Sequence, residues 1–428
     1  MSAPTATPTT ARNATLEDLA AILKDQQART VDFVAPASKL RAKDGALIVK
    51  DTEAVLTEDG VTTTDGTYVP TTTADGGIAD KLKVPSKWLT GLRAERGWMY
   101  DQVVNGMLHG KAVKRAGGEL EVITPGDDRS FLLRTFRGDD GGPGILRAFL
   151  SDRFGIIDNL DILVATLQAV RDAGVEISVH STDLTENRMF IRAHAPAVAA
   201  LAPVLLGGYR NPFADPAIDA QRRFDGAGLD SVAPAREIER WRQIAAAEGM
   251  GYAPGAEPVV FAGFRISNSE VGGGAFSIAP ELRVQVCRNG LVLNALAERS
   301  VHLGQRLDNG VVEWSEATQR KSLDLIVSKT RDVVKRFLSP EFLAAQVAGI
   351  EEKAGKPVES PEATVKALGK NLKFSQDEID GVLGHFIRGG QMTAGGVLNA
   401  ITSYSQTVPN ADRANELDGV AMQALSMV

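Results

Sequence analysis

Arginine and phenylalanine alternate on both sides of a glycine-rich segment in the first third of the chain. The arginines are Arg129, Arg134, Arg137, Arg147 and Arg153, and the phenylalanines are Phe131, Phe136, Phe149 and Phe154. Guanidinium groups hold phosphates and aromatic rings stack on bases, so this pattern is typical of proteins that bind single-stranded nucleic acid. The alternative is that the rings belong to the hydrophobic core and the arginines to an ordinary surface.

A second group of cations follows one predicted helix, residues 315–337. At about 100° per residue these side chains share one half of the helix, opposite an apolar stripe. They are Arg320, Lys321, Lys329, Arg331, Lys335 and Arg336. A cationic half of this length predicts phosphate binding driven by counterion release. Asp324 and Asp332 lie in the same half, however, and a solvated helix face explains the pattern without any ligand.

Polar residues flank the strand-like runs between residues 259 and 296. They are Asn268, Ser269, Glu270, Arg283 and Asn289. If these side chains converge, Glu270 would serve as the general acid or base of an unfamiliar enzyme site. Glycines 272–274 follow directly and would let backbone amides approach a phosphate. We favour the simpler interpretation, which is hydrogen bonding within a bulged hairpin turn.

The histidines and the single cysteine do not form a metal-binding pattern. No two of the five histidines stand at the short spacing that places two ligands on one helical face. His180 and His194 are expected to meet across adjacent strands with Asp183 or Glu186 nearby, as ordinary histidines at the edge of the core. Cys287 ends an apolar run, which is typical of a buried strand-end cysteine. The sequence therefore predicts no metal and no cofactor.

Recognisable catalytic motifs are also missing from the sequence. The nearest match to a phosphate-binding loop, residues 349–357, has five residues between its glycines and Pro357 where Ser or Thr must bind magnesium. There is no Gly-x-Ser-x-Gly elbow for a nucleophilic serine. We therefore expect a noncatalytic protein, with no catalytic residue to name.

The composition is that of a globular chain. Of its 428 residues 43% are hydrophobic and 24% are charged, and the formal net charge is −7, which argues against disorder and against a dedicated duplex-DNA binder. One cysteine fits a reducing compartment. The sequence lacks an apolar run of about 18 residues and a signal-like start, so we expect a cytoplasmic protein without a membrane partner.

The candidate residues must be positioned by a mixture of strands and helices. The pattern predicts an α+β fold, with a mixed, mainly antiparallel sheet, packed helices and a helical C-terminal region. The expected regions are a disordered tail at residues 1–14, an N-terminal α+β region at 15–140, a central α+β core at 145–338 and a helical region at 340–428. The glycine-rich residues 138–144 are expected to separate the two halves.

Individual elements follow from periodicity and capping. Helices are expected at residues 16–23 after the cap Thr15, at 78–96 with a boundary at Pro85, and at 145–154, 159–173 and 315–337. Strands are expected at 120–124, 130–136, 175–182, 188–194 and 259–267, and a strand or strand–helix piece at 103–108. Asp-Gly pairs at Asp44, Asp59, Asp65 and Asp75 indicate turns.

Three stretches of this sequence in combination resemble a known family. Residues 146–154 with 157–159, residues 267–272 and residues 283–291 resemble the phage/plasmid-like protein family, a domain of unknown function, and residues 399–404 are similar to its C-terminal motif. The resemblance spans roughly residues 82–425. It implies a bacteriophage or plasmid gene expressed in the bacterial cytoplasm, and it implies no particular reaction.

Together these patterns favour a noncatalytic nucleic-acid-handling accessory protein of a phage or plasmid. Its expected role is to bind or anneal single-stranded DNA as a homo-oligomer. The alternatives are a module that binds a host or phage protein, and an enzyme with a site around Glu270. The leading hypothesis requires Arg134, Arg147 and Lys329 to line one exposed groove rather than to pair with carboxylates of the same chain.

Overall fold

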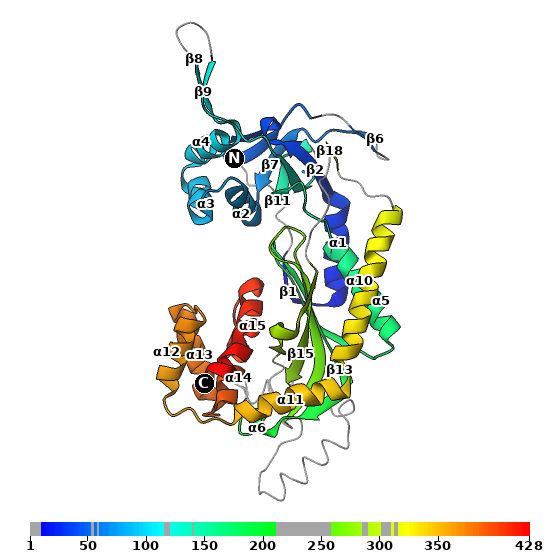
Figure 1. Cartoon of the computed structure of the whole chain (residues 1–428), viewed down its shortest axis with the longest axis vertical. Helices are drawn as coiled ribbons and strands as arrows, with labels where there is room; N and C mark the ends of the chain where they lie inside the picture. The colour runs from blue at the N-terminus through cyan, green and yellow to red at the C-terminus, as the bar shows by residue number, and fades with distance from the viewer. Residues whose placement is uncertain are drawn as a thin grey trace, which may run out of the picture.

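The computed structural model describes residues 10–52, 55–57, 60–114, 120–138, 141–210, 258–284, 290–300, 310–311 and 316–428. Two seven-stranded sheets, which we call the N-terminal sheet and the central sheet, organise these residues. Helices pack on both sheets, and a group of helices forms the C-terminal region (Figure 1). The α+β class that the sequence predicts is confirmed.

The N-terminal sheet has the strand order β18-β2-β10-β11-β7-β4-β3. These strands are Gly310–Val311, Thr30–Pro36, Ser130–Phe136, Gly144–Ser151, Gly66–Pro70, Ala46–Val49 and Leu40–Lys43. Its pairs are antiparallel except β7 with β11. Because β10 pairs with β11, the glycine-rich segment joins two neighbouring strands of one sheet. The predicted boundary between residues 140 and 145 therefore falls inside this sheet, and the predicted helix at 145–154 is instead strand β11.

Three helices cover one face of the N-terminal sheet. They are α2 (Thr72–Lys81), α3 (Ser86–Glu95) and α4 (Gly97–His109), and their buried side chains share a core with β2, β10 and β11. The backbone of α2 lies so close to β11 that a Cβ at Gly77 would stand 2.6 Å from the carbonyl oxygen of Phe149. Two sequence expectations are wrong here. Residues 103–108 are helical throughout, and Asp75 lies inside α2 rather than in a turn.

The central sheet has the order β1-β12-β13-β14-β15-β16, with β17 also paired to β15. Its strands are Ala11–Ala14, Ser178–Leu184, Met189–Leu201, Val259–Asn268, Phe276–Val284, Gly290–Val292 and Glu298–Ser300. Residues 11–14 were expected in a disordered tail, but they form β1. The carboxylate of Asp183 on β12 fixes them, because it accepts from the side chain of Arg12 at 2.6 Å and from the backbone N–H of Asn13 at 2.9 Å.

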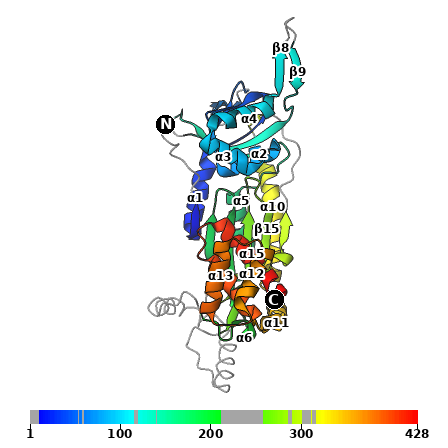
Figure 2. The ribbon, with the colours of Figure 1, turned by 90° about the vertical axis from the view of Figure 1, so that its left-hand side faces the viewer.

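Three helices cover one face of the central sheet: α1 (Leu16–Arg29), α5 (Asn159–Ala173) and α10 (Glu316–Phe337). The side chain of Thr15 caps α1, and Gly174 ends α5 in the left-handed conformation, as the sequence predicts. Figure 2 shows α1 descending from the N-terminal sheet alongside the central sheet, with the two regions stacked along the long axis.

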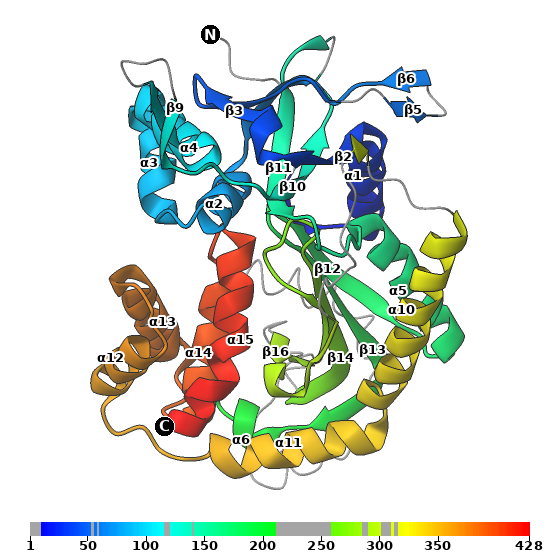
Figure 3. The same cartoon turned by 45° about the horizontal axis from the view of Figure 1, so that its top comes forward.

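The C-terminal region is helical, as predicted. It contains α11 (Pro340–Ala354), α12 (Pro361–Asn371), α13 (Gln376–Gly389), α14 (Ala394–Ser405) and α15 (Ala411–Met427). Helices α11 and α14 contact the short α6 (Pro203–Leu206). Figure 3 shows α14 and α15 on the opposite side of the central sheet from α5 and α10. The central sheet is thus enclosed between two helical layers.

Candidate functional site

Arg134 is the centre of a buried charge cluster between the two sheets. It lies on β10 directly opposite Asp32 of β2, and its side chain is only 1% exposed. The guanidinium donates to Asp32 at 2.9 Å, to Asp158 at 2.5 Å and to the backbone carbonyl of Glu270 at 2.7 Å. Burial disfavours the charged form of Arg134, but the two carboxylates raise its pKa. All three nitrogens of this guanidinium therefore donate to groups of the same chain.

Arg147 joins the same cluster because of a β-bulge. The register between β10 and β11 passes from Ala148 to Leu146, which leaves Arg147 as the extra residue on β11. Its guanidinium forms an ion pair with the carboxylate of Glu270 and lies 4.2 Å from the ring centroid of Phe136. The other carboxylate oxygen of Glu270 accepts from the backbone N–H of Asn159, the first residue of α5, at 2.9 Å.

The Arg/Phe segment therefore does not form the exposed groove that the sequence hypothesis requires. Arg134 and Arg147 pair with carboxylates of the same chain, and the rings of Phe131, Phe136 and Phe149 are buried. The physical reason is that β10 and β11 lie inside a sheet covered on both faces. Helices α2–α4 cover one face, and the turn between β14 and β15 meets the other. Three arginines of this predicted set, Arg129, Arg137 and Arg153, are exposed, and Arg129 pairs with Asp127.

The predicted polar cluster around Glu270 is divided by the structure. Asn268 donates to the side chain of Asn159 at 2.9 Å, and Ser269 donates to the backbone carbonyl of Asn187 at 2.6 Å. These are hydrogen bonds that hold the hairpin turn in place. Arg283 pairs in register with Phe261, six positions along β15 from the turn pair Ser267–Ser277, or about 20 Å away. Asn289 lies outside the described residues.

The cations of α10 remain at the surface. Lys321, Lys329 and Lys335 are exposed and form no ion pair with any described residue, whereas Arg331 pairs with its neighbour Asp332. The side chain of Arg320 lies outside the described residues. Asp324, Asp332 and the 57% exposed Leu325 share this surface. The face is therefore mixed in character rather than continuously cationic.

A second buried charge cluster, which the sequence interpretation missed, attaches α15 to the central sheet. Arg192 of β13 donates to Asp418 at 2.5 Å and to Asn415 at 2.7 Å, and it lies 3.3 Å from Glu281 of β15. Arg265 of β14 donates to the backbone carbonyl of Asn415 at 3.1 Å. The sequence signal for this cluster was a charged residue in the middle of each otherwise apolar strand. The sequence of the strands does not indicate that the partner of these residues is α15.

His180 and His194 meet as expected, with their ring centroids 5.3 Å apart in an edge-to-face arrangement. Burial, with Arg283 beside the rings, lowers the pKa of both imidazoles, that of His194 to about 3. Within the described ranges no three His, Cys, Asp or Glu side chains are arranged to hold a metal ion. Cys287 lies outside those ranges.

Exposed cations and tryptophans gather on and next to α3 and α4. We call this group the α3–α4 surface and define it as Lys83, Lys87, Trp88, Arg96 and Trp98. The indoles of Trp88 and Trp98 are 49% and 62% exposed, although tryptophan is normally largely buried. The three cations are exposed and form no ion pair in the part of the chain that the structure describes. Their neighbour Arg93 is different, because it donates to the buried Asp75 at 2.5 Å.

The segment that contains this surface is basic, in contrast to the chain as a whole. Residues 81–114 contain seven Lys or Arg and two Asp or Glu, in a chain of net charge −7. Of the two acids, Asp101 accepts from the backbone N–H groups of Asp44 and Gly45. The sequence indicated the basic character of this segment, but not the exposure of its tryptophans. On α3 Lys87 lies opposite the apolar side formed by Leu89 and Leu92, and Trp88 lies at the edge of that side, so its exposure could not be read from the helical pattern.

No protein-family model matches the chain, and neither does any curated protein or solved structure. The resemblance to the phage/plasmid-like family therefore stays a prediction. Among the described helices none is long and apolar enough to cross a membrane.

Proposed function

We propose that this protein is a noncatalytic binder of single-stranded nucleic acid and that the strand lies on the α3–α4 surface. The observation that carries the proposal is the pair of exposed indoles among exposed cations that form no ion pair with any described residue. Proteins that bind single strands combine aromatic side chains, on which bases stack, with cations that follow the phosphates. The surface supplies both, in a segment, residues 81–114, that contains seven Lys or Arg and two Asp or Glu.

The geometry of the two helices supports contacts with more than one base. Trp88 lies in the first turn of α3, and Trp98 lies in the first turn of α4, just beyond the end of α3. The axis of α3 rises about 10 Å between Trp88 and Glu95, and each exposed indole offers a ring face of its own on which a base could stack. Lys87 stands one position before Trp88 and Arg96 two positions before Trp98, so a cation is close to each indole along the chain.

The locally positive field also favours a polyanion over a protein partner. An exposed tryptophan is a common anchor in protein interfaces as well. In such interfaces the cations usually pair with acidic groups of the partner protein. When a protein binds nucleic acid, its cations release counterions from the phosphates, so the affinity falls steeply as the salt concentration rises. The salt dependence of binding therefore separates the two classes of partner.

The test is fluorescence anisotropy with a labelled oligothymidylate of about 20 nucleotides, longer than one binding module usually covers. We expect binding at low salt that weakens steeply between about 50 and 200 mM salt. The double variant Lys83→Ala/Lys87→Ala should bind more weakly and with a smaller salt slope, by up to about two phosphate contacts.

The matched control removes two exposed lysines from the other basic surface, as Lys329→Ala/Lys335→Ala on α10. Figure 3 shows α3 on the left and α10 on the right of the molecule, so the two variants probe separate faces. The control should keep the wild-type affinity. An absence of binding at micromolar protein rejects the function, and a loss confined to the α10 variant moves the site to α10.

The resemblance to the phage/plasmid-like family adds a setting to this proposal. In that setting the protein would protect or anneal single strands during recombination of a phage or plasmid, working as a homo-oligomer in the bacterial cytoplasm.

A further inference from the structure

Helix α4 presents an exposed stripe that begins at one of the two indoles. Four of its residues fall within about 80° of one another at about 100° per residue, and all four are exposed. They are Trp98, Gln102, Gly106 and His109. The stripe therefore extends the α3–α4 surface along the length of α4.

The polar groups of this stripe are not engaged within the protein. Gln102 and His109 form no side-chain hydrogen bond or ion pair with any described residue. Their neighbours differ, because Asn105 bonds to both the backbone N–H and the backbone C=O of Ala42, at 2.8 Å each. Asp101, the single acid of α4, accepts from two backbone N–H groups of the turn between β3 and β4. Gln102 and His109 are therefore available to a ligand, and neither repels a phosphate.

The stripe leads to a cation at the base of a hairpin. Lys111 is the first residue of β8 (Lys111–Lys114), which pairs with β9 (Leu120–Thr124). Figure 1 shows this hairpin projecting from the end of α4 away from both sheets. The side chain of Lys111 is exposed and forms no ion pair with any described residue. Because Arg96 precedes α4, exposed cations stand at both ends of the stripe.

The length and chemistry of the stripe suit several consecutive nucleotides. The axis of α4 rises about 16 Å between Trp98 and His109, the length of about five stacked nucleotides at roughly 3.4 Å each. Glutamine donates hydrogen bonds to phosphates and sugars, and histidine rings stack on bases. Between Gln102 and His109 the surface is open, because a Cβ at Gly106 would meet nothing within 4 Å.

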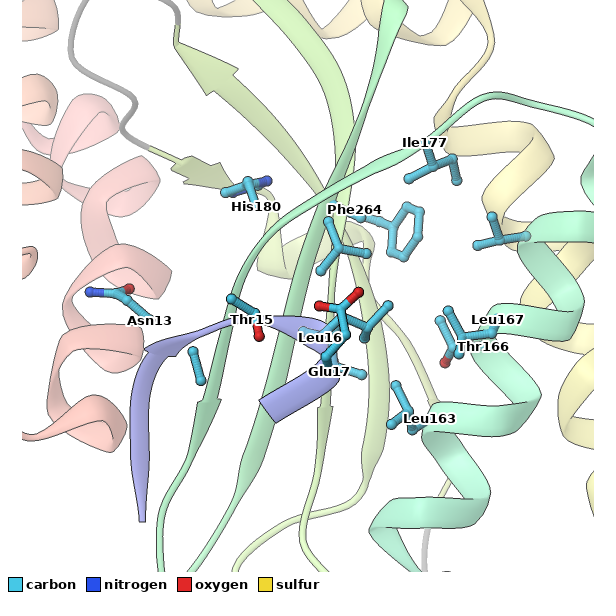
Figure 4. A pocket seen from close by; sticks show the side chains of 15 residues that line it. Asn13, Thr15, Leu16, Glu17, Leu163, Thr166, Leu167, Ile177, His180 and Phe264 are labelled. Carbon is cyan, nitrogen blue, oxygen red and sulfur yellow. The ribbon is translucent and has the colours of Figure 1, made fainter. Parts of the chain in front are cut away.

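A cavity of about 510 Å³ in the other half of the molecule offers no such path. It lies between α5, the junction of β1 with α1, and the central sheet. Figure 4 shows Leu163 and Leu167 of α5 on one side of it and Glu17 of α1 in front. Its described lining contains no Lys or Arg. A polyanion would therefore meet no cationic side chain there, and the cavity does not compete with α4 for the strand.

We propose that the bound strand continues from Trp98 along α4 to Lys111, with one base stacked on the imidazole of His109. This inference rests on the proposed function, because it extends the same surface. It also narrows the class of ligand. Since about five nucleotides occupy α4, the ligand is an extended unpaired strand rather than a mononucleotide.

The first test changes the charge in the middle of the stripe. Gly106→Glu should weaken the binding of an oligothymidylate of about 20 nucleotides about fivefold at about 0.1 M salt, and Gly106→Lys should strengthen it by a similar factor. This is the counterion effect of about one phosphate contact on a single strand. Both substitutions suit the fold, because Glu and Lys favour a helix more than Gly does and the site has room for a side chain.

The matched control makes the same two changes at Gly349 of α11. Gly349 is also an exposed helical glycine at which a Cβ would meet nothing within 4 Å. Gly349→Glu and Gly349→Lys change the net charge equally but lie on another surface, so both should keep the wild-type affinity.

The second test concerns the stack on His109. His109→Ala should weaken binding about fivefold or more, the lower end of the usual loss for one stacked base. His109→Phe keeps an aromatic ring and should bind within about twofold of wild type. Equal losses of affinity in the two variants would exclude a base on this side chain.

The outcomes separate this inference from the proposed function. A wild-type protein that does not bind oligothymidylate overturns both. Binding that Trp88→Ala weakens, but that both Gly106 variants and His109→Ala leave unchanged, overturns this inference alone, because the strand would then leave α4 beyond Trp98.

Discussion

Two segments of the N-terminal region share a combination of residue types, but one segment is buried and the other is exposed. The β10–β11 segment and the α3–α4 segment both place cations beside aromatic rings. In the first, Arg134 and Arg147 are buried against carboxylates and the phenylalanines are core; in the second, Trp88 and Trp98 face solvent. The comparison teaches that the number of covered faces of an element, rather than its composition, decides which cations are exposed to solvent.

The number of covered faces follows from the kind of element. Strands β10 and β11 have neighbours on both edges and are packed on both faces, so a cation there must find an internal carboxylate. Helices α3 and α4 bury one side and leave the other to water. The guanidinium groups in the strands join the two sheets through internal ion pairs, whereas that of Arg96, at the end of α3, is exposed and forms no ion pair with a described residue.

The largest effect is expected at the buried cation Arg134. Arg134→Met leaves Asp32 and Asp158 buried without their partner, which should lower the free energy of unfolding by about 3–5 kcal/mol. Urea unfolding followed by circular dichroism measures this change. Lys87→Met on α3 is the control, and it should stay within about 0.5 kcal/mol of wild type. Equal stability of the two variants would contradict the contrast between the segments.

A double-mutant cycle tests whether the ion pair between Arg147, at the β11 bulge, and Glu270 contributes to stability. Arg147→Met and Glu270→Gln should each destabilise the protein, because each leaves one buried group without its ion-pair partner. The double variant should cost less than the two single costs together, by at least about 1 kcal/mol of coupling. Strictly additive costs in urea unfolding would show that this ion pair does not contribute to the junction.

The exposed tryptophans should affect binding and leave stability unchanged. Trp88→Ala and Trp98→Ala should each reduce oligothymidylate affinity about tenfold or more, the usual cost of losing one stacked base. Their free energies of unfolding should change by less than about 0.5 kcal/mol. Ile387→Ala is the control, since Ile387 is equally exposed, at 58%, but lies on α13. A similar loss of affinity in all three variants would exclude a stacking role.

The smallest effect is a pH dependence at the edge of the junction cluster. Burial, with Asp158 beside it, raises the pKa of Asp161 from 3.8 to about 6. The native protein then holds this proton more tightly than the unfolded chain does, so stability falls as pH rises through that window. Asp161→Asn should match wild type near pH 4 and should melt at a higher temperature above pH 6. An equal difference in Tm at both pH values would show that Asp161 does not titrate in this window.

Local patterns in the sequence predicted the elements whose signals are local. Thr15 and Gly174 marked helix ends correctly, and the long helix at residues 315–337 was evident from its periodicity. The errors fall where a pattern is ambiguous. The run of apolar residues in β11 suits a buried helix or a strand covered on both faces. Residues 103–108 belong to a helix whose buried spacing, Tyr100, Val104 and Leu108, is apparent only over a longer window.

The site could be predicted in its chemistry but not in its location. Aromatic rings beside cations were recognised in the sequence, yet the burial of Arg134 depends on Asp158 and on the backbone of Glu270, which lies 136 positions away in sequence. No local rule connects such positions. The cavity is equally long-range, because it joins β1, α5 and the central sheet.

Photo-crosslinking followed by peptide mapping tests the central claim most directly. After irradiation of the complex with oligothymidylate and digestion with trypsin, the crosslinked nucleotides should lie in the peptides 88–93 and 97–111, which contain Trp88 and Trp98. Crosslinks confined to peptides of α10 or of β10–β11 would contradict the claim that the strand lies on the α3–α4 surface.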